Sequence, residues 1–340
     1  MATIKEIAAR CGCSAATVSK ALHGMPDIGA ETKKRIQKVA REMGYVPNSA
    51  ARTLRTNRSQ TIGLLLFLRG TSVWEHEYFV QIAAGIHSVT EPAGYDLCPV
   101  SSDQKGIAGF YLDYCAHRGY DGVIIMSAGF EEPGLRQMVE SQIPMVTIDY
   151  SFPQLCSVEA DNRYGMQEMV RYIIGCGHQR IAFIHGEDST VTRTRLAAFR
   201  EACAKHGVHV PPEYIKPSVY RNTESSARAT QELLALPQRP TCIIFPDDYA
   251  YIGGRNVILD AGLRIPEDIS VAGYDGIPLA ELVRPKLTTV SQNAHEIGVL
   301  TGQLMLKTIH AKGAFTPDHI TVPSIFIKGA SVAPVSPASA

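Results

Sequence analysis

The chain has 340 residues, of which 45% are hydrophobic and 19% are charged, and its formal net charge is zero. This length exceeds what one ordinary hydrophobic core organises and is typical of two or three globular domains. The sequence opens without the apolar segment of a secretion signal, and no apolar run reaches the length of a membrane span. These features exclude the membrane and secreted classes, so we expect a cytoplasmic, nucleoid-associated protein with no membrane partner.

The zero net charge hides a strong asymmetry along the chain. The first 60 residues contain 11 Lys and Arg but only 4 Asp and Glu, whereas the remainder contains 22 against 29. A basic segment attached to an acidic body favours binding of a polyanion at one end and opposes nonspecific binding elsewhere. The charge pattern therefore indicates a nucleic-acid partner for the N-terminal part.

The first 22 residues predict two short helices joined by a tight turn. Thr3 and Glu6 fit a capping box at the start of the first helix, Gly12 permits the turn, and Ser14 is placed to cap the second helix. A third helix is expected from about Ala30 to Met43. The apolar residues that would bury its contacts with the first two helices lie at helical spacing: Ile4, Ile7, Ala8, Val18, Leu22, Ile36, Val39 and Ala40.

The second helix would expose Ala15, Ala16, Thr17 and Lys20 near its start. The alanines permit close approach to a DNA major groove, Thr17 can contact a thymine methyl group, and Lys20 can reach a base or a phosphate. The alternative interpretation is a plain three-helix bundle with a solvated basic face, because pairs of short helices are common.

A second basic segment follows, in which Asn48 can cap a short helix and Leu54 lies between Arg52 and Arg55. An isolated short helix is marginal in water, so we expect this one to order only on DNA or against a second copy of the chain. An apolar side chain flanked by arginines suits the minor groove, where it can separate a base step. The alternative is a flexible basic linker.

Eight cysteines are scattered through apolar segments without the spacing of a disulfide framework. Cys11 and Cys13 are the only close pair, and no further ligand follows at the spacing of a metal site. We interpret the cysteines as small packing residues and expect neither a metal nor a cofactor.

From Thr61 onwards, strand-like apolar runs alternate with helical patterns in two successive series. This alternation predicts parallel sheets with ligand sites at the carboxyl ends of the strands, and two series suggest two lobes with a cleft between them. The sequence lacks G-x-G-x-x-G, Walker, G-x-S-x-G and H-E-x-x-H motifs. We therefore expect a binding protein rather than an enzyme.

Polar residues at strand ends are the ligand candidates. Asp275 ends the run ISVAGYD, Asp247 and Asp248 end CIIFPDD, Arg195 opens RLAAFREA, and Asp161 lies where the chain would cross between lobes. Carboxylates near an arginine suit a polyhydroxylated ligand, because a carboxylate accepts hydrogen bonds from hydroxyl groups. The alternative is that these residues are helix caps and surface charges.

The sequence resembles the LacI/GalR family of bacterial transcription regulators nearly from end to end. TIKEIAARCGCSAATVSKAL is similar to the helix-turn-helix of that family, and GYVPNSAARTLRTNRSQTIGLLL to its hinge and first strand. The later segments follow in the order of the family: DNRYGMQEMVRYIIGCGHQRIAFIHG, RLAAFREA and IPEDISVAGYDGIPLAELVRPKLTTVSQ.

The resemblance implies an all-α helix-turn-helix head plus an α/β two-lobed body like that of periplasmic binding proteins. It also implies a homodimeric repressor that binds a palindromic operator in double-stranded DNA, with Leu54 as the intercalating leucine, under control of a small-molecule effector. The expected domains are the head (1–46), the hinge helix and linker (47–60), the body (61–332) and a disordered tail (333–340). Lobe 1 would comprise about 61–160 and 290–321, and lobe 2 about 161–289 and 322–332.

The resemblance also assigns residues to the two expected sites. Those expected at DNA are Thr3, Ser14, Ala15, Ala16, Thr17, Lys20, Asn48, Ala51, Arg52, Leu54 and Arg55. Those expected at the effector are Trp74, Phe79, Asp161, Arg195, Arg221, Asp247, Asp275 and Gln292.

Four positions depart from the pattern of the family and bear on the effector. Asp247 stands where Asn is common, Arg221 where an aromatic side chain often stacks on the ligand, and Ser189 near an arginine of purine-responsive relatives. Trp74 is a candidate for the missing stacking face or, alternatively, for a loop anchor. We expect a sugar effector; the alternatives are a nucleobase, an anionic sugar acid or phosphate, and an effector that acts as a co-repressor.

Overall fold

The computed structural model describes residues 2–22, 25–45, 58–66, 76–100, 110–127, 133–311 and 316–335. The chain divides into two compact units, Met1–Ser59 and Gln60–Ala340, which are called the head and the body below. Six of the residues expected at DNA or at the effector lie outside the described ranges: Asn48, Ala51, Arg52, Leu54, Arg55 and Trp74.

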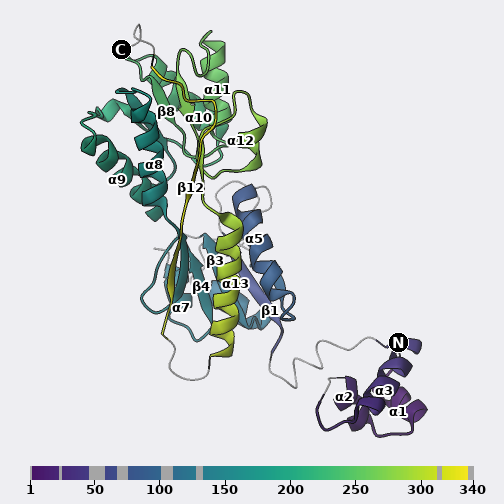
Figure 1. The fold of residues 1–340 in the computed structure, drawn as a ribbon. Coiled ribbons are helices and arrows are strands. Elements are labelled where there is room, and N and C mark those ends of the chain that lie inside the picture. The colour runs from purple at the N-terminus through teal and green to yellow at the C-terminus, as the bar shows by residue number, and fades with distance from the viewer. Residues whose placement is uncertain are drawn as a thin grey trace. The chain divides into compact units, whose positions relative to one another are not determined.

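The head contains helices α1 (Ile4–Cys11), α2 (Ala15–Leu22) and α3 (Ala30–Glu42) (Figure 1). The capping box expected at the start of α1 is present: the Thr3 hydroxyl accepts from the Glu6 amide at 3.3 Å, and the Glu6 carboxylate accepts from the Thr3 amide at 2.8 Å. Gly12 ends α1 with a positive φ of 60°, a conformation that glycine adopts without strain. The predicted order of turn and helices is therefore confirmed.

A small hydrophobic core holds the three helices together. Ile7, Val18 and Ile36 are completely buried, one from each helix. Cys11 is buried beside them, as expected for a packing residue, while Leu22 only packs against the edge of this core. Close packing of these side chains sets the angle at which α2 leaves α1.

The body begins with a six-stranded parallel sheet in the order β11-β5-β4-β3-β1-β2. Its strands are β1 (Thr61–Leu66), β2 (Asp96–Pro99), β3 (Gly122–Ser127), β4 (Met145–Ile148), β5 (Cys156–Ala160) and β11 (His319–Val322). Helices α5 (Glu77–Thr90) and α13 (Ala294–His310) pack on one face, and α6 (Phe110–Arg118) and α7 (Pro133–Val139) on the other. Both faces are covered, which is why the inner strands β1 and β3 are apolar runs without polar alternation.

The second lobe contains a four-stranded parallel sheet in the order β7-β6-β8-β9. Its strands are β6 (Ile181–His185), β7 (Ile215–Pro217), β8 (Cys242–Ile244) and β9 (Ser270–Ala272). Helices α8 (Asn162–Gly175) and α9 (Thr190–Lys205) pack on one face, and α10 (Thr223–Leu234) and α11 (Tyr251–Asp260) on the other. The short helices η2 (Pro212–Tyr214) and α12 (Pro278–Leu282) complete this lobe.

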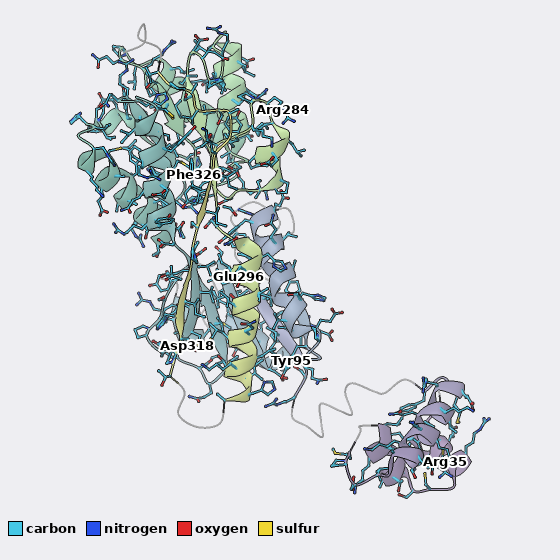
Figure 2. The ribbon with its side chains drawn as sticks, in the orientation of Figure 1. Arg35, Tyr95, Arg284, Glu296, Asp318 and Phe326 are labelled. Carbon is cyan, nitrogen blue, oxygen red and sulfur yellow. The ribbon has the colours of Figure 1, made fainter. Side chains whose placement is uncertain are left out.

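Three segments of chain connect the lobes (Figure 1). The first runs from β5 to α8, the second from β10 (Thr289–Ser291) to α13, and the third from β11 to β12 (Ile325–Ile327), which pairs with β10 in an antiparallel ribbon. Figure 2 labels both ends of the third segment: Asp318 precedes β11 in the first lobe, and Phe326 packs on Tyr172 in the second. Because the three crossings lie side by side, all of the chain that connects the lobes passes through one boundary between them.

The predicted start of the disordered tail, at residue 333, is too early in the chain. Residues 333–335 are bound to the second lobe: His178 is hydrogen-bonded to the Ala333 carbonyl at 3.0 Å, and the Val335 amide donates to the Cys176 carbonyl at 2.9 Å. These two hydrogen bonds hold residues 333–335 in place despite the Pro- and Ser-rich composition from which a disordered tail was expected. Residues 336–340 lie outside the described ranges.

The architecture confirms the predicted fold class, an all-α head plus an α/β body with two parallel sheets. In the part of the chain that the structure describes, no helix combines the length and apolarity needed to span a bilayer.

Helices α5 and α13 approach each other through glycines, which gives the first test. A Cβ atom on Gly85 would lie 2.2 Å from the His295 carbonyl oxygen and 2.9 Å from the Val299 amide nitrogen. We expect Gly85→Ala to lower the free energy of unfolding of the body by about 1–3 kcal/mol, because backbone atoms must move apart. Urea denaturation followed by circular dichroism measures this change.

Gly175→Ala is the matched control, since Gly175 lies at the end of a helix and a Cβ atom added to it would meet nothing within 4 Å. It should leave stability unchanged or raise it by up to about 1 kcal/mol. Equal denaturation midpoints for the two variants would contradict the close helix crossing.

Candidate functional site

The start of α2 carries the side chains expected at DNA. The Ser14 hydroxyl accepts a hydrogen bond from the Thr17 amide at 3.0 Å, which caps the helix, and it lies 2.9 Å from the Thr17 hydroxyl. Ala15 and Ala16 are exposed and Thr17 is half-buried. A capped helix end with two small exposed residues has the shape that a major groove admits.

Lys20 pairs with Asp27 at 2.5 Å, and both side chains are about half exposed. An exposed ion pair contributes little stability, so a DNA phosphate can replace Asp27 at small cost. Thr3 uses both its amide and its hydroxyl in the capping box of α1. In the structure, Thr3 therefore caps the N-terminus of α1.

The body contains a cavity of about 280 Å³ with walls from both lobes. This volume is close to the lower end of the ~300–1,000 Å³ typical of small-molecule sites. His76, Glu77 and Tyr78, at the start of α5, form the wall from the first lobe. The wall from the second lobe contains Arg221, Asp247, Tyr249, Asp275, Ile277, Pro278, Leu279 and Leu282.

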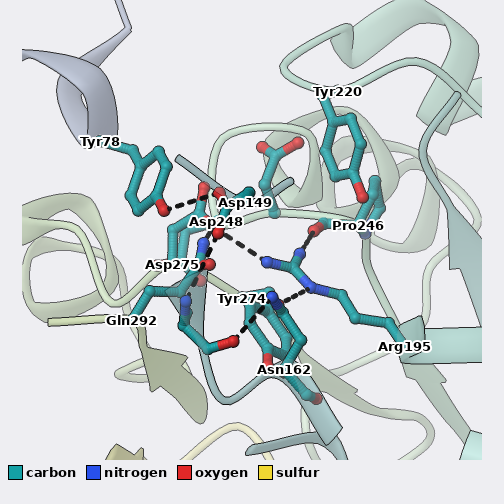
Figure 3. Close-up of polar contacts among 12 residues, drawn as sticks. Tyr78, Asp149, Asn162, Arg195, Tyr220, Pro246, Asp248, Tyr274, Asp275 and Gln292 are labelled. Carbon is teal, nitrogen blue, oxygen red and sulfur yellow. Dashed lines mark hydrogen bonds and ion pairs between the residues drawn. The ribbon is translucent and has the colours of Figure 1, made fainter. Parts of the chain in front are cut away.

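Arg195 lies beside this cavity, on α9, and is only 3% exposed. Its Nε donates to the Asn162 side-chain oxygen at 2.7 Å, and its Nη1 donates to the Pro246 carbonyl at 3.3 Å (Figure 3). The guanidinium carbon lies 3.6 Å from the centre of the Tyr274 ring, and Nη2 is 4.0 Å from Asp275 Oδ1. These contacts fix a buried positive charge next to Asp275.

Asp275 follows β9 with an unusual φ of 102°, and its Oδ1 accepts a hydrogen bond from the side-chain Nε2 of Gln292 at 2.5 Å. Gln292 is 2% exposed and follows β10, so this bond ties a strand end of the second lobe to the second crossing. Burial raises the pKa of Asp275 to about 7, and the nearby Arg195 charge limits that rise. The carboxyl group is therefore able to donate or accept a proton near neutrality.

The first lobe contributes a carboxylate that the sequence analysis did not select. Asp149 accepts a hydrogen bond from the Tyr78 hydroxyl at 3.2 Å, and burial raises its pKa to about 6 (Figure 3). Asp149 directly follows β4, so the strand-end rule that selected Asp275 applies to it equally. Tyr78 is the residue before Phe79 and was missed because no pattern distinguished it from a core aromatic.

Asp247 and Asp248 are adjacent in sequence but have different environments. Asp247 lines the cavity and accepts from the backbone amides of Arg221, Tyr249 and Ala250 at 2.6–2.9 Å. Asp248 is completely buried and accepts from the Thr289 hydroxyl at 2.6 Å. Only Asp247 is at the candidate site, and its oxygens already hold the backbone around it.

Of the three remaining residues expected at the effector, only Arg221 lines the cavity. Arg221 lines the cavity, with its guanidinium carbon 4.6 Å from the centre of the Tyr249 ring. Phe79 is 8% exposed in the core of the first lobe, where its ring centre lies 4.7 Å from that of His76. Asp161 caps α8 by accepting from the Tyr164 amide at 2.9 Å, which matches the alternative interpretation as a helix cap.

Similarity to known proteins covers both units. Residues 3–48 match the family described as bacterial regulatory proteins, lacI family, and residues 170–332 match a periplasmic binding protein-like domain. The chain is 34% identical over 313 residues to the probable HTH-type transcriptional repressor ExuR of Bacillus subtilis strain 168, covering 91% of this chain and 92% of that protein. The chain belongs to the LacI family.

Two solved structures have the same architecture. The complex of the transcriptional regulator CelR with cellobiose aligns with a TM-score of 0.74 at 25% identity, covering 97% of this chain and all of that one. The lac repressor dimer bound to operator and the anti-inducer ONPF aligns with a TM-score of 0.83 at 23% identity, covering 98% and 99%. Members of this family are regulators, so the chain is a transcriptional regulator and not an enzyme.

The raised pKa of Asp149 gives a test of the cleft. Its folded-state pKa of about 6 lies above its ordinary value of 3.8, so the folded state binds more protons between these values. The contribution of Asp149 to the free energy of unfolding should therefore fall as the pH rises from about 4 to 6, and that of Asp275 should fall further towards pH 7. Buried His76, whose pKa is lowered to about 3, contributes with the opposite sign, so the test is the difference between variants. We expect Asp149→Asn to become more stable relative to the unsubstituted protein as the pH rises from about 4 to 6, because the amide does not ionise.

Urea unfolding at pH 4.5, 6 and 7.5 measures these slopes. Asp268→Asn is the control: Asp268 pairs with Arg264, which lowers its pKa to about 2, so its effect lies below this window. Identical slopes for Asp149→Asn and the unsubstituted protein would show that Asp149 is hydrated rather than buried.

Proposed function

We propose that this protein is a repressor that binds a palindromic operator as a homodimer and is controlled by a small-molecule effector held between its lobes. The observation that carries the proposal is the cavity of about 280 Å³ whose walls come from both lobes. The lac repressor structure is described as a dimer on its operator with a ligand, and the shared fold supports the same assembly here.

A ligand in this cavity couples the lobes by direct contact. It lies between Tyr78 on the first lobe and Asp275 on the second, and three chain crossings join the lobes. A ligand shifts an equilibrium only by its differential affinity for two states, and a ligand that touches both walls favours the arrangement in which both contacts form. Lobe closure is thus the step that such an effector controls.

The polar groups around the cavity suit a sugar. Tyr78 and Gln292 are fixed by Asp149 and Asp275, while Asp275 and the buried Arg195 supply acceptors and donors in a small volume. Hydroxyl groups of a sugar both donate and accept, so they satisfy such a mixed set. The related CelR structure contains cellobiose, which supports this ligand class.

A nucleobase effector has less support. Ser189, at the position near an arginine of purine-responsive relatives, accepts from the Thr192 amide at 3.1 Å and caps α9. Its hydroxyl is therefore used within the helix end, and it carries no positive charge for a base.

At DNA, we propose that the exposed start of α2 reads the major groove while Leu54 enters the minor groove between the half-sites. Ala15 and Ala16 allow close approach, and Lys20 exchanges Asp27 for a phosphate or base. The basic side chains of the head supply the salt-dependent part of the affinity.

Leu54→Ala tests the DNA-binding part of the proposal. The variant should bind an operator, selected from genomic fragments, at least about tenfold more weakly, because the loss of an apolar wedge removes stabilisation of the kinked step. Its affinity for random DNA and the salt dependence of that affinity should stay unchanged, since the phosphate-binding cations remain. Fluorescence anisotropy at several salt concentrations measures both.

The result that would sink the wedge role is an equal loss of affinity on operator and random DNA. A full-length protein with no sequence preference at low salt would refute the repressor proposal itself. Leu54→Met provides the control, because it keeps a large apolar side chain and should retain most of the preference.

A further inference from the structure

One wall of the cavity contains a buried polar atom without a partner. His76 is 8% exposed and lines the cavity, and its Nδ1 makes no hydrogen bond with any described residue. Buried polar groups are almost always paired, so an unpaired nitrogen at a cavity wall indicates a group that a ligand satisfies. The ring is held in place by edge contacts with Tyr78 and Phe79, with centres 6.2 Å and 4.7 Å apart.

The same wall is the N-terminus of a long helix. His76 is the N-cap of the 14-residue helix α5, and its side chain does not cap the helix amides. His76, Glu77 and Tyr78 all line the cavity, so the first turn of α5 opens onto it. The first amides of a helix lack internal partners and carry a partial positive charge, which attracts anions.

A cation from the second lobe lies at the same cavity. Arg221 has a positive φ of 57°, its amide donates to Asp247 at 2.7 Å, and its guanidinium stacks on Tyr249. These contacts hold the side chain at the cavity wall. Burial lowers the pKa of His76 to about 3, and the Arg221 charge contributes to this, so the imidazole is neutral beside a cation.

The negative charges of the cavity carboxylates are largely balanced by hydrogen-bond donors and by the cation of Arg195. Asp247 accepts three backbone amides, and Asp275 accepts from Gln292 beside the buried Arg195. Glu77 is exposed, which lets water screen its charge. The cavity lining therefore contains two chemically different sets of groups: the carboxylates with their hydrogen-bonding neighbours, and a set made of His76, the α5 amides and Arg221.

We propose that the effector is an anionic sugar, whose negatively charged group lies between His76 and Arg221 at the N-terminus of α5. Its hydroxyl groups would then be bound by Tyr78 and Asp275. Because His76 belongs to the first lobe and Arg221 to the second, the anion also bridges the lobes. This inference rests on the proposed sugar-controlled repressor and specifies the class of its ligand; a carboxylate and a phosphate are the two groups with the required chemistry.

The test is isothermal titration calorimetry on the full-length protein. The probes are D-glucose and D-galactose, their uronates, D-glucose 6-phosphate, and inorganic phosphate. We expect at least one anionic sugar to bind about tenfold or more tightly than its neutral parent, which is what a charge-assisted hydrogen bond supplies. The uronate and phosphate arms distinguish the two sources of charge.

Arg221→Gln should weaken binding of that anionic sugar about tenfold and leave its neutral parent unchanged, while Arg221→Lys should retain part of the preference. His76→Phe keeps the ring packing and should weaken the same ligand. Arg228→Gln, an exposed arginine of α10 paired with Glu224, is the matched control and should change nothing.

Tighter binding of a neutral sugar than of its acid or phosphate, dependent on Asp275, would overturn the anionic class and leave the sugar-controlled repressor standing. An anionic preference that survives Arg221→Gln would overturn the assigned position. Binding of inorganic phosphate as tight as that of any sugar would show that no sugar is recognised, and would refute both the inference and the sugar effector. Operator binding is measured separately, so none of these outcomes bears on the proposal that the protein binds an operator.

Discussion

The arrangement of the cleft depends on the buried guanidinium of Arg195. A charge that is 3% exposed is stable only when surrounding groups replace its water, and its partners come from separate parts of the second lobe. Asn162 follows the first crossing, Pro246 follows β8, and Tyr274 and Asp275 follow β9. Satisfying this one cation therefore brings two strand ends and a crossing to the same point, beside the ligand cavity.

The same physical constraint explains how ligand binding reaches the rest of the molecule. Asp275 joins Arg195 to Gln292 on the second crossing, and Tyr78 joins Asp149 on the first lobe. Burial raises the pKa of both Asp149 and Asp275. A ligand that hydrogen-bonds to either carboxyl group therefore changes its protonation and, with it, the hydrogen bonds that the group makes within its lobe. The head enters this scheme as a separate unit whose own core and caps keep it folded.

Local chemistry made much of this predictable from sequence. Thr3, Gly12 and Ser14 each have a short-range role in capping or turning. The strand-end position selected Asp275, and the family resemblance selected Arg195, which lies on α9. The rest depends on tertiary contacts: Asp247 and Asp248 are sequence neighbours with different partners, and Asp161 satisfies its own helix instead of facing the cavity. His76 has no sequence signal, because its role depends on burial without a partner, a property of packing alone.

Coupling between cavity and operator is the central claim, and one measurement tests it directly. Operator affinity is measured by fluorescence anisotropy with and without saturating amounts of the sugar that binds most tightly in isothermal titration calorimetry, for the unsubstituted protein and for Asp275→Asn. We predict that the sugar changes the operator affinity of the unsubstituted protein by at least about fivefold, the scale of ordinary allosteric coupling, and has little effect on the variant. A sugar that binds the cavity but leaves operator affinity unchanged would contradict the account.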